Sequence, residues 1–291
     1  MPGSPSFRGG PLHKIVFLLI FLGMFPLNVE AQDDSEGFAE KWQTRASRTQ
    51  AKQPKWSVPM VAPFPMVAQV YRTDFTHQIT STGPEIWNLG TGKGFNLIPF
   101  ANTQIDILTP GYVLHNDSAP DGFGDISFLA KYRFLSANEQ HGNYVMSGAV
   151  GWSFPTGSYK NGVATAMITP TLLGGKGFGR LAVMSSLGGG LPISDARTNG
   201  RTIHANTVAQ YHVGKYFWPE VEFNTTSYLG GTRDGKTQTF ITPGVMVGKF
   251  ALRPEGAKSR MGLAAGVAFQ TALTSFHTYN HAVVVSVRFG F

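Results

Sequence analysis

Residues Ala282–Phe291 read AVVVSVRFGF and alternate in character along the chain. Steps of two counted back from Phe291 collect an apolar face, made of Phe289, Val287, Val285 and Val283. The opposite face carries Arg288 and Ser286 among small or apolar residues. An alternating strand that closes on an aromatic residue is typical of the last strand of a transmembrane β-barrel, with its apolar face toward lipid.

The first residues have the pattern of an export signal. Basic Arg8 and Lys14 precede an apolar run from Ile15 to Phe25, and the small residue Ala31 follows. This run is too short to cross a bilayer of about 30 Å as a helix. We therefore expect residues 1–31 to be a signal peptide that is removed on export.

Composition narrows the classes of protein further. The chain has no cysteine, which excludes disulfides, thiolate metal sites and lipid attachment through cysteine. The formal net charge is +7, and removal of the signal, whose net charge is +1, leaves +6. Because the lysines and arginines are scattered rather than gathered in one patch, no nucleic-acid partner is expected. Contact with anionic lipopolysaccharide, or an anion preference in a lumen, accounts for the surplus.

A polar leader precedes the strands. Residues 32–65 include a stretch, 36–51, that favours a short helix, and four prolines follow it at 54, 59, 63 and 65. Two interpretations stay open for this leader, which we place in the periplasm. It either reaches into a lumen as a partial plug or remains a disordered tail.

Residues 66–291 break into strand-length segments. From Gly124 to Leu135 the even positions are apolar or aromatic, whereas Asp125, Lys131 and Arg133 lie on the odd positions. These charges must face a lumen or an interface, because Arg or Lys in mid-membrane costs about 2–4 kcal/mol. A secreted β-sandwich, the alternative fold, would need two equal apolar sheet faces.

We predict an all-β protein, a transmembrane antiparallel up-and-down β-barrel of about twelve strands, with ten or fourteen as the other even counts. The expected strands lie near 67–79, 84–91, 95–107, 124–135, 143–154, 163–174, 179–190, 202–213, 216–228, 237–249, 260–272 and 280–291. Short turns are expected at Gly175–Gly177 and Gly214–Lys215.

Polar side chains on the inward positions of these strands are the predicted lining of a pore. They are Asp125, Lys131, Arg133, His204, Asn206, Gln210, Glu220, Glu222 and Arg288. Among them, Glu220, Glu222, Lys131 and Arg133 are expected to exchange ion pairs across strands.

No catalytic residue, metal or cofactor is predicted. His277 and His281 would lie about 13 Å apart on a strand, too far for one metal ion. Ser227 and Ser286 are the serines a hydrolase would use, but no G-x-S-x-G turn surrounds either of them. The glycine-rich stretch Gly174–Gly179 lacks the Ser/Thr and helix of a phosphate loop, and we expect a hairpin there.

The stretch Gly122–Leu135, GFGDISFLAKYRFL, resembles a segment of the bacterial outer-membrane family labelled MetA-pathway of phenol degradation, or putative transporter. The stretches Gly151–Gly157, Ile168–Pro170 and Gln210–Gly214 are similar to that family as well. The resemblance extends from about residue 67 onward. It implies an outer-membrane barrel that passes aromatic or other poorly soluble carbon compounds.

The leading hypothesis is an outer-membrane channel or transporter, not an enzyme, for passive uptake of small and in part aromatic or hydrophobic molecules. An outer-membrane lipid-modifying enzyme and a structural or adhesive barrel are the alternatives. Expected partners are outer-membrane lipids and lipopolysaccharide, a small-molecule solute, and the barrel-assembly machinery through Phe291. The expected location is the outer membrane of a Gram-negative bacterium.

Overall fold

The computed structural model describes residues 37–80, 83–90, 93–158, 161–252 and 260–291. Apart from Gly37 and Phe38 these residues belong to one compact unit, Ala39–Phe291. The predicted signal peptide, 1–31, and the first residues of the leader lie outside the described residues. None of the helices in the described ranges has the length and apolar character needed to cross a membrane.

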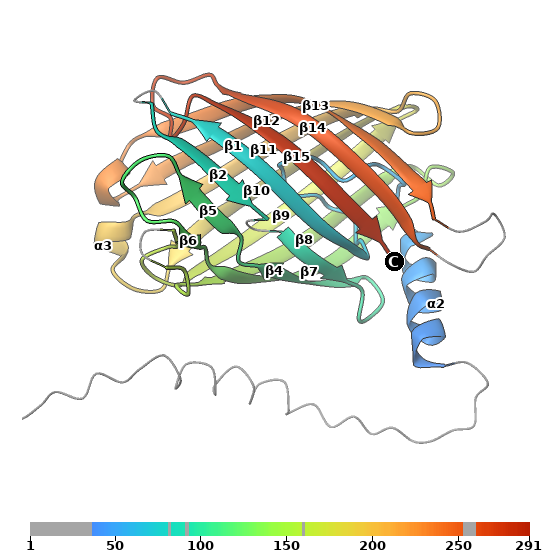
Figure 1. Cartoon of the computed structure of the whole chain (residues 1–291). Coiled ribbons are helices and arrows are strands. Elements are labelled where there is room, and N and C mark those ends of the chain that lie inside the picture. The colour runs from blue at the N-terminus through green and yellow to red at the C-terminus, as the bar shows by residue number, and fades with distance from the viewer. Residues whose placement is uncertain (1–36, 81–82, 91–92, 159–160, 253–259) are drawn as a thin grey trace, which may run out of the picture. The chain divides into compact units, whose positions relative to one another are not determined.

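One antiparallel sheet dominates the unit, and pairing between its last strand and its first closes it into a barrel (Figure 1). Its strands are β1 (Val70–Ile79), β2 (Glu85–Leu89), β3 (Lys93–Leu97), β4 (Thr103–Thr109), β5 (Tyr112–His115), β6 (Gly122–Phe123), β7 (Ile126–Ala137), β8 (Tyr144–Phe154), β9 (Met167–Phe178), β10 (Leu181–Pro192), β11 (Arg201–Tyr211), β12 (Phe217–Leu229), β13 (Thr237–Ala251), β14 (Gly262–Ala272) and β15 (His281–Gly290).

The fifteen strands occupy twelve positions around the wall, because at three positions the strand is interrupted and is counted as two. β2 and β3 share one position, since both pair with β1. β4 and β5 follow as the next position, and β6 and β7 as the third. The predicted twelve-stranded antiparallel barrel is therefore confirmed.

Two predicted strand boundaries are wrong. The segments near 84–91 and 95–107 were expected as separate strands, but β2 and β3 occupy one strand position beside β1, and the turn comes at 98–102. Asn102 takes a left-handed φ of 61° in that turn. At the interruption Gly90 takes a φ of 84°, and its N–H donates to the carbonyl of Asp74 at 2.7 Å. The chain therefore bulges at 90 instead of turning.

The hairpin expected at Gly175–Gly177 is also displaced, since β9 continues to Phe178 and the turn uses Gly179 with a φ of 62°. Gly175 has a packing reason to be small. A Cβ there would lie 2.6 Å from the ring of Trp56.

Inward and outward positions of the wall follow the predicted alternation. Lys131 and Arg133 are 4% and 2% exposed, whereas their neighbours Tyr132 and Phe134 are 55% and 44% exposed. Most of the exposed large apolar side chains of the strands alternate with these inward positions in the same way. The outer surface is thus apolar and the interior holds the charges, as a wall surrounded by lipid requires.

Two short helices lie at opposite ends of the barrel (Figure 1). The end that holds the start of β1 and the end of β15 is called the terminal end here, and α2 (Phe38–Gln50) lies beside it. α3 (Ala196–Asn199) lies at the opposite end, called the far end. A hydrogen bond from Trp42 Nε1 to Gln69 Oε1 at 2.6 Å holds α2 to the chain just before β1.

Residues 54–69, called the lumen segment here, connect α2 to β1 by a path through the barrel. Met60 and Val67 of this segment are fully buried, and Met66 is nearly so. Trp56, Phe64 and Met66 pack with inward residues of the wall such as Val145 and Met184. The lumen is therefore occupied by the protein's own chain along this path.

Candidate functional site

Two carboxylates of β12 bind the lumen segment through its backbone N–H groups. Glu220 Oε1 accepts a hydrogen bond from Met60 N at 2.8 Å. Glu222 Oε1 accepts one from Val61 N at 2.9 Å, and its Oε2 accepts one from Ala62 N at 2.7 Å. Three successive backbone donors thus end on two buried carboxylates.

Basic side chains of other strands bind the carbonyl groups of the same segment. Arg288 of β15 donates to Val58 O and Pro59 O, and Arg72 of β1 donates to Pro59 O and Met60 O. On β7, three strand positions from β1, Lys131 Nζ donates to Phe64 O at 3.0 Å and to Met66 O at 2.9 Å.

These contacts correct the expected pattern of ion pairs. Glu220, Glu222, Lys131 and Arg133 form no ion pairs with one another in the described ranges. The physical reason is that an extended segment inside a barrel has no strand partner, so its backbone groups need other hydrogen-bond partners. The wall charges supply them, and charge-assisted hydrogen bonds are the stronger kind.

The structure divides the nine predicted pore-lining residues into three groups. Lys131, Glu220, Glu222 and Arg288 hold the lumen segment directly, and Gln210 and Arg133 lie beside them: Gln210 Nε2 donates to Glu220 Oε2, and Arg133 donates to Gln53 and Asn102. His204 pairs with Thr226, and Asn206 pairs with Ser186 and with Asn224, whose Nδ2 also donates to Glu222 Oε2 at 3.4 Å.

Asp125 forms the third group and lies apart from the other eight residues. Its carboxylate accepts hydrogen bonds from Gly157 N at 2.8 Å and Val163 N at 2.6 Å, so it organises the far-end connection between β8 and β9. Ser286, one of the serines weighed for hydrolysis, donates to Asp74 Oδ1 and accepts from Arg288 Nε. Its partners are thus a carboxylate and a guanidinium, with no histidine among them in the described ranges.

Sequence reasoning missed Arg72, Asp74 and Lys93. Arg72 and Asp74 form a buried ion pair at 2.6 Å, and Lys93 Nζ lies 3.9 Å from Asp74 Oδ2. The signal was present, because Arg72 and Asp74 stand two apart in a predicted strand and must share its inward face.

A cavity of about 300 Å³, called the mid-barrel cavity here, lies beside residues 61–64 of the lumen segment. Its remaining walls come from β1, β3, β4, β7, β8 and β9. Apolar side chains predominate in its lining, including Phe64, Leu108, Leu129 and Leu173.

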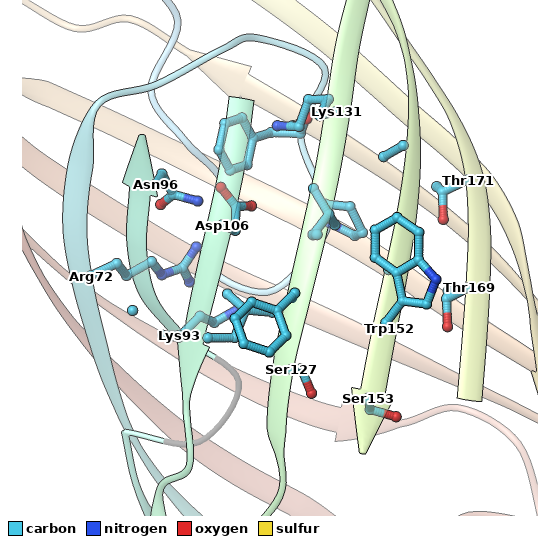
Figure 2. A pocket seen from close by; sticks show the side chains of 18 of the residues that line it. Arg72, Lys93, Asn96, Asp106, Ser127, Lys131, Trp152, Ser153, Thr169 and Thr171 are labelled. Atoms are coloured by element: carbon cyan, nitrogen blue, oxygen red, sulfur yellow. The ribbon is translucent and has the colours of Figure 1, made fainter. Parts of the chain in front are cut away.

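Three of the four charged residues that line the mid-barrel cavity gather on one side, and Lys131 of β7 is the fourth. Figure 2 shows Arg72, Lys93 and Asp106 together on that side, with Trp152 and Thr169 across from them. The side chain of Lys93 is 25% accessible, whereas that of Arg72 is only 6% accessible, so Lys93 is the more available of these two cations. The arrangement suits a small, mostly apolar molecule with one polar group.

A second cavity of about 430 Å³, called the end cavity here, lies at the terminal end of the barrel. The start and finish of the lumen segment form one side, and β12 to β15 form the other. Arg72 and Asn96 line both cavities, so the two are neighbours within the lumen.

No family model matches this chain, and no curated protein matches it. The fold is similar to the crystal structure of an outer membrane channel from Pseudomonas putida, with a TM-score of 0.57 and 14% identity over 81% of this chain and 100% of that one. The translocator domain of the autotransporter NalP from Neisseria meningitidis covers 77% of this chain and 88% of its own at 13% identity, with a TM-score of 0.42. The fold is that of an outer-membrane β-barrel, and the resemblance to the phenol-degradation family stays a prediction.

Proposed function

We propose that this protein is an outer-membrane channel or transporter that passes small, largely apolar molecules, aromatic compounds among them, passively across the membrane of a Gram-negative bacterium. The single observation that carries the proposal is the mid-barrel cavity beside the lumen segment. Its volume of about 300 Å³ and its mainly apolar lining with a few polar groups are those of a small-molecule site.

The occupied lumen decides which solutes the proposal covers. A twelve-stranded barrel is narrower than a porin, and here the lumen segment fills part of its bore. Flux of water-soluble molecules through a wide aqueous pore is therefore not the proposed activity. The solute instead moves beside the segment, from the mid-barrel cavity to the adjoining end cavity and the compartment at the terminal end.

Two further considerations support this function. The similar protein from Pseudomonas putida is described as an outer membrane channel. The family that the sequence resembles is proposed to pass aromatic carbon compounds, which agrees with an apolar cavity. We place the terminal end in the periplasm, where bacterial barrels of even strand number keep both chain ends.

The test is solute flux into vesicles that contain the purified protein, with toluene as the apolar aromatic solute and glucose as the polar one. The vesicles carry lipopolysaccharide in their outer leaflet, and each flux is counted above that of protein-free vesicles, because toluene also crosses lipid unaided. Thr169 lines the mid-barrel cavity, so the larger side chain of Thr169→Phe should fill it. We expect toluene flux to fall about tenfold, because a small misfit between a ligand and its pocket changes rates by about this factor. Leu172→Phe is the matched control, because Leu172 lies on the same strand and is exposed on the outer face.

Equal toluene flux through the Thr169→Phe and Leu172→Phe proteins would remove the cavity from the route. For the unmodified protein, glucose flux equal to toluene flux, each counted above that of protein-free vesicles, would contradict the proposed class of solute.

A further inference from the structure

The end cavity has an unbalanced charge. Five basic residues line it, Lys55, Arg72, Lys249, Arg260 and Arg288, and the described residues of its lining include no aspartate or glutamate. The mid-barrel cavity differs in this respect, because Asp106 is part of its lining. The end cavity is therefore electropositive relative to its neighbour.

Two of the five cations are already committed. Arg72 pairs with Asp74 and donates to carbonyls of the lumen segment. Arg288 donates to Val58 O, Pro59 O and the hydroxyl of Ser286. Both are about 5% exposed and hold the structure of the barrel interior.

Lys249 and Arg260 are differently placed. Lys249 Nζ donates to the carbonyl of Arg260, and Arg260 donates to Ser47 Oγ of α2 at 3.1 Å. Within the described ranges neither forms an ion pair with a carboxylate. A lysine has three donors and an arginine five, so this pair has capacity to bind an anion.

The rest of the end cavity is apolar and includes two indole rings. Trp56 of the lumen segment and Trp218 of β12 both line it, with Met246 and Ala264 beside them. Trp218 is held in place by stacking on His212, with 3.9 Å between the ring centroids. Flat, immobilised aromatic surfaces favour a flat apolar ligand.

From this juxtaposition we infer that the end cavity binds a small aromatic carboxylate, with its ring beside Trp56 and Trp218 and its carboxylate between Lys249 and Arg260. The planar guanidinium of Arg260 matches the geometry of a carboxylate. The volume of about 430 Å³ exceeds what one aromatic ring with a carboxylate needs. The inference goes beyond the proposed function, because it concerns binding at equilibrium and needs no passage of solute.

Calorimetric titration of the full purified protein in detergent micelles tests it, with benzoate as the anion and benzyl alcohol as its neutral counterpart. Benzoate should bind at least about tenfold more tightly, since charge-assisted hydrogen bonds are worth that factor or more. Lys249→Gln and Arg260→Gln, singly and together, should each weaken benzoate binding without weakening that of benzyl alcohol.

Lys176→Gln is the matched control. Lys176 Nζ also donates to a backbone carbonyl at the terminal end, that of Gly142, but Lys176 lies outside the cavity lining. Its substitution should leave benzoate binding unchanged, and circular dichroism should confirm that all the variants fold.

Three results would overturn the inference. They are equal binding of benzoate and benzyl alcohol, equal loss in the Lys176→Gln protein, and binding of inorganic phosphate as tight as that of benzoate. The last would show that the rings add nothing to recognition. Because the assay measures no flux, a failure here is distinguishable from a failure of the proposed transport.

Discussion

Glu222 is a fully buried carboxylate whose two oxygens both accept hydrogen bonds from the backbone of the lumen segment. Burial of a charge is tolerated where it is hydrogen-bonded in this way. At the scale of single residues, charged side chains of the wall therefore bind backbone N–H and C=O groups of the segment. Within the part of the chain that the structure describes, they do not pair with charged side chains of the segment.

Replacement of Glu222 by Gln should loosen the segment. The amide nitrogen would face the N–H of Val61 or Ala62, and leaving a buried donor without its acceptor costs about 1–3 kcal/mol. We expect faster proteolytic cleavage within residues 54–69 of the purified protein, measured by mass spectrometry of the fragments.

Glu85→Gln is the control for this change. Glu85 is a partly exposed carboxylate on β2 that pairs with His77, away from the segment. Cleavage rates that are the same in the two variants would mean that Glu222 does not hold the segment.

The lumen segment is an element without a strand partner, and the barrel closes independently of it. β15 pairs with β1 over Val70–Ile79 without a break in register, so closure lies outside the segment. The segment therefore obstructs the bore without completing the wall.

Deletion of residues 37–66 should open the barrel. The freed charges of the wall would be hydrated, and a water-filled bore would follow, narrower than that of a porin. We expect ion conductance in planar bilayers to rise above that of the full chain, because a barrel of this strand number has an interior wider than its side chains fill. Unchanged conductance, with an unchanged β-sheet spectrum, would show that the segment does not block the bore.

The whole molecule presents an apolar exterior around a charged interior, the reverse of a water-soluble protein. Leu187 lies in the middle of β10, exposed on the outer face, whereas Ile193 is exposed just beyond the far end of that strand. If the barrel spans a membrane, these two positions lie at different depths.

Leu187→Arg should lower the free energy of unfolding in lipid vesicles by about 2–4 kcal/mol, and Ile193→Arg by about 0–1 kcal/mol. Urea unfolding followed by tryptophan fluorescence measures both. Equal, small effects would indicate that the middle of β10 is not surrounded by hydrocarbon.

Some features of the molecule could be predicted from short stretches of sequence alone. The alternation at Gly124–Leu135 and at Ala282–Phe291 determines which side chains face inward, because the side-chain period of a strand is two whatever its neighbours are. The count of twelve followed from such segments and the turns between them. Lys131, Arg133, Glu220, Glu222 and Arg288 were identified as inward by this local rule.

Only the tertiary structure decided what those inward charges bind. Glu222 meets residues 61 and 62 across about 160 positions of chain, and Arg288 meets residue 58 across 230. No local period encodes such pairings. The same holds for the bulge at Gly90 and for Gly175 beneath Trp56, because each depends on which distant segment lies against the strand. The sequence by itself determined which faces of the strands point inward and outward. The path of the lumen segment and the two cavities required the closed barrel, because a cavity exists only where separate elements meet.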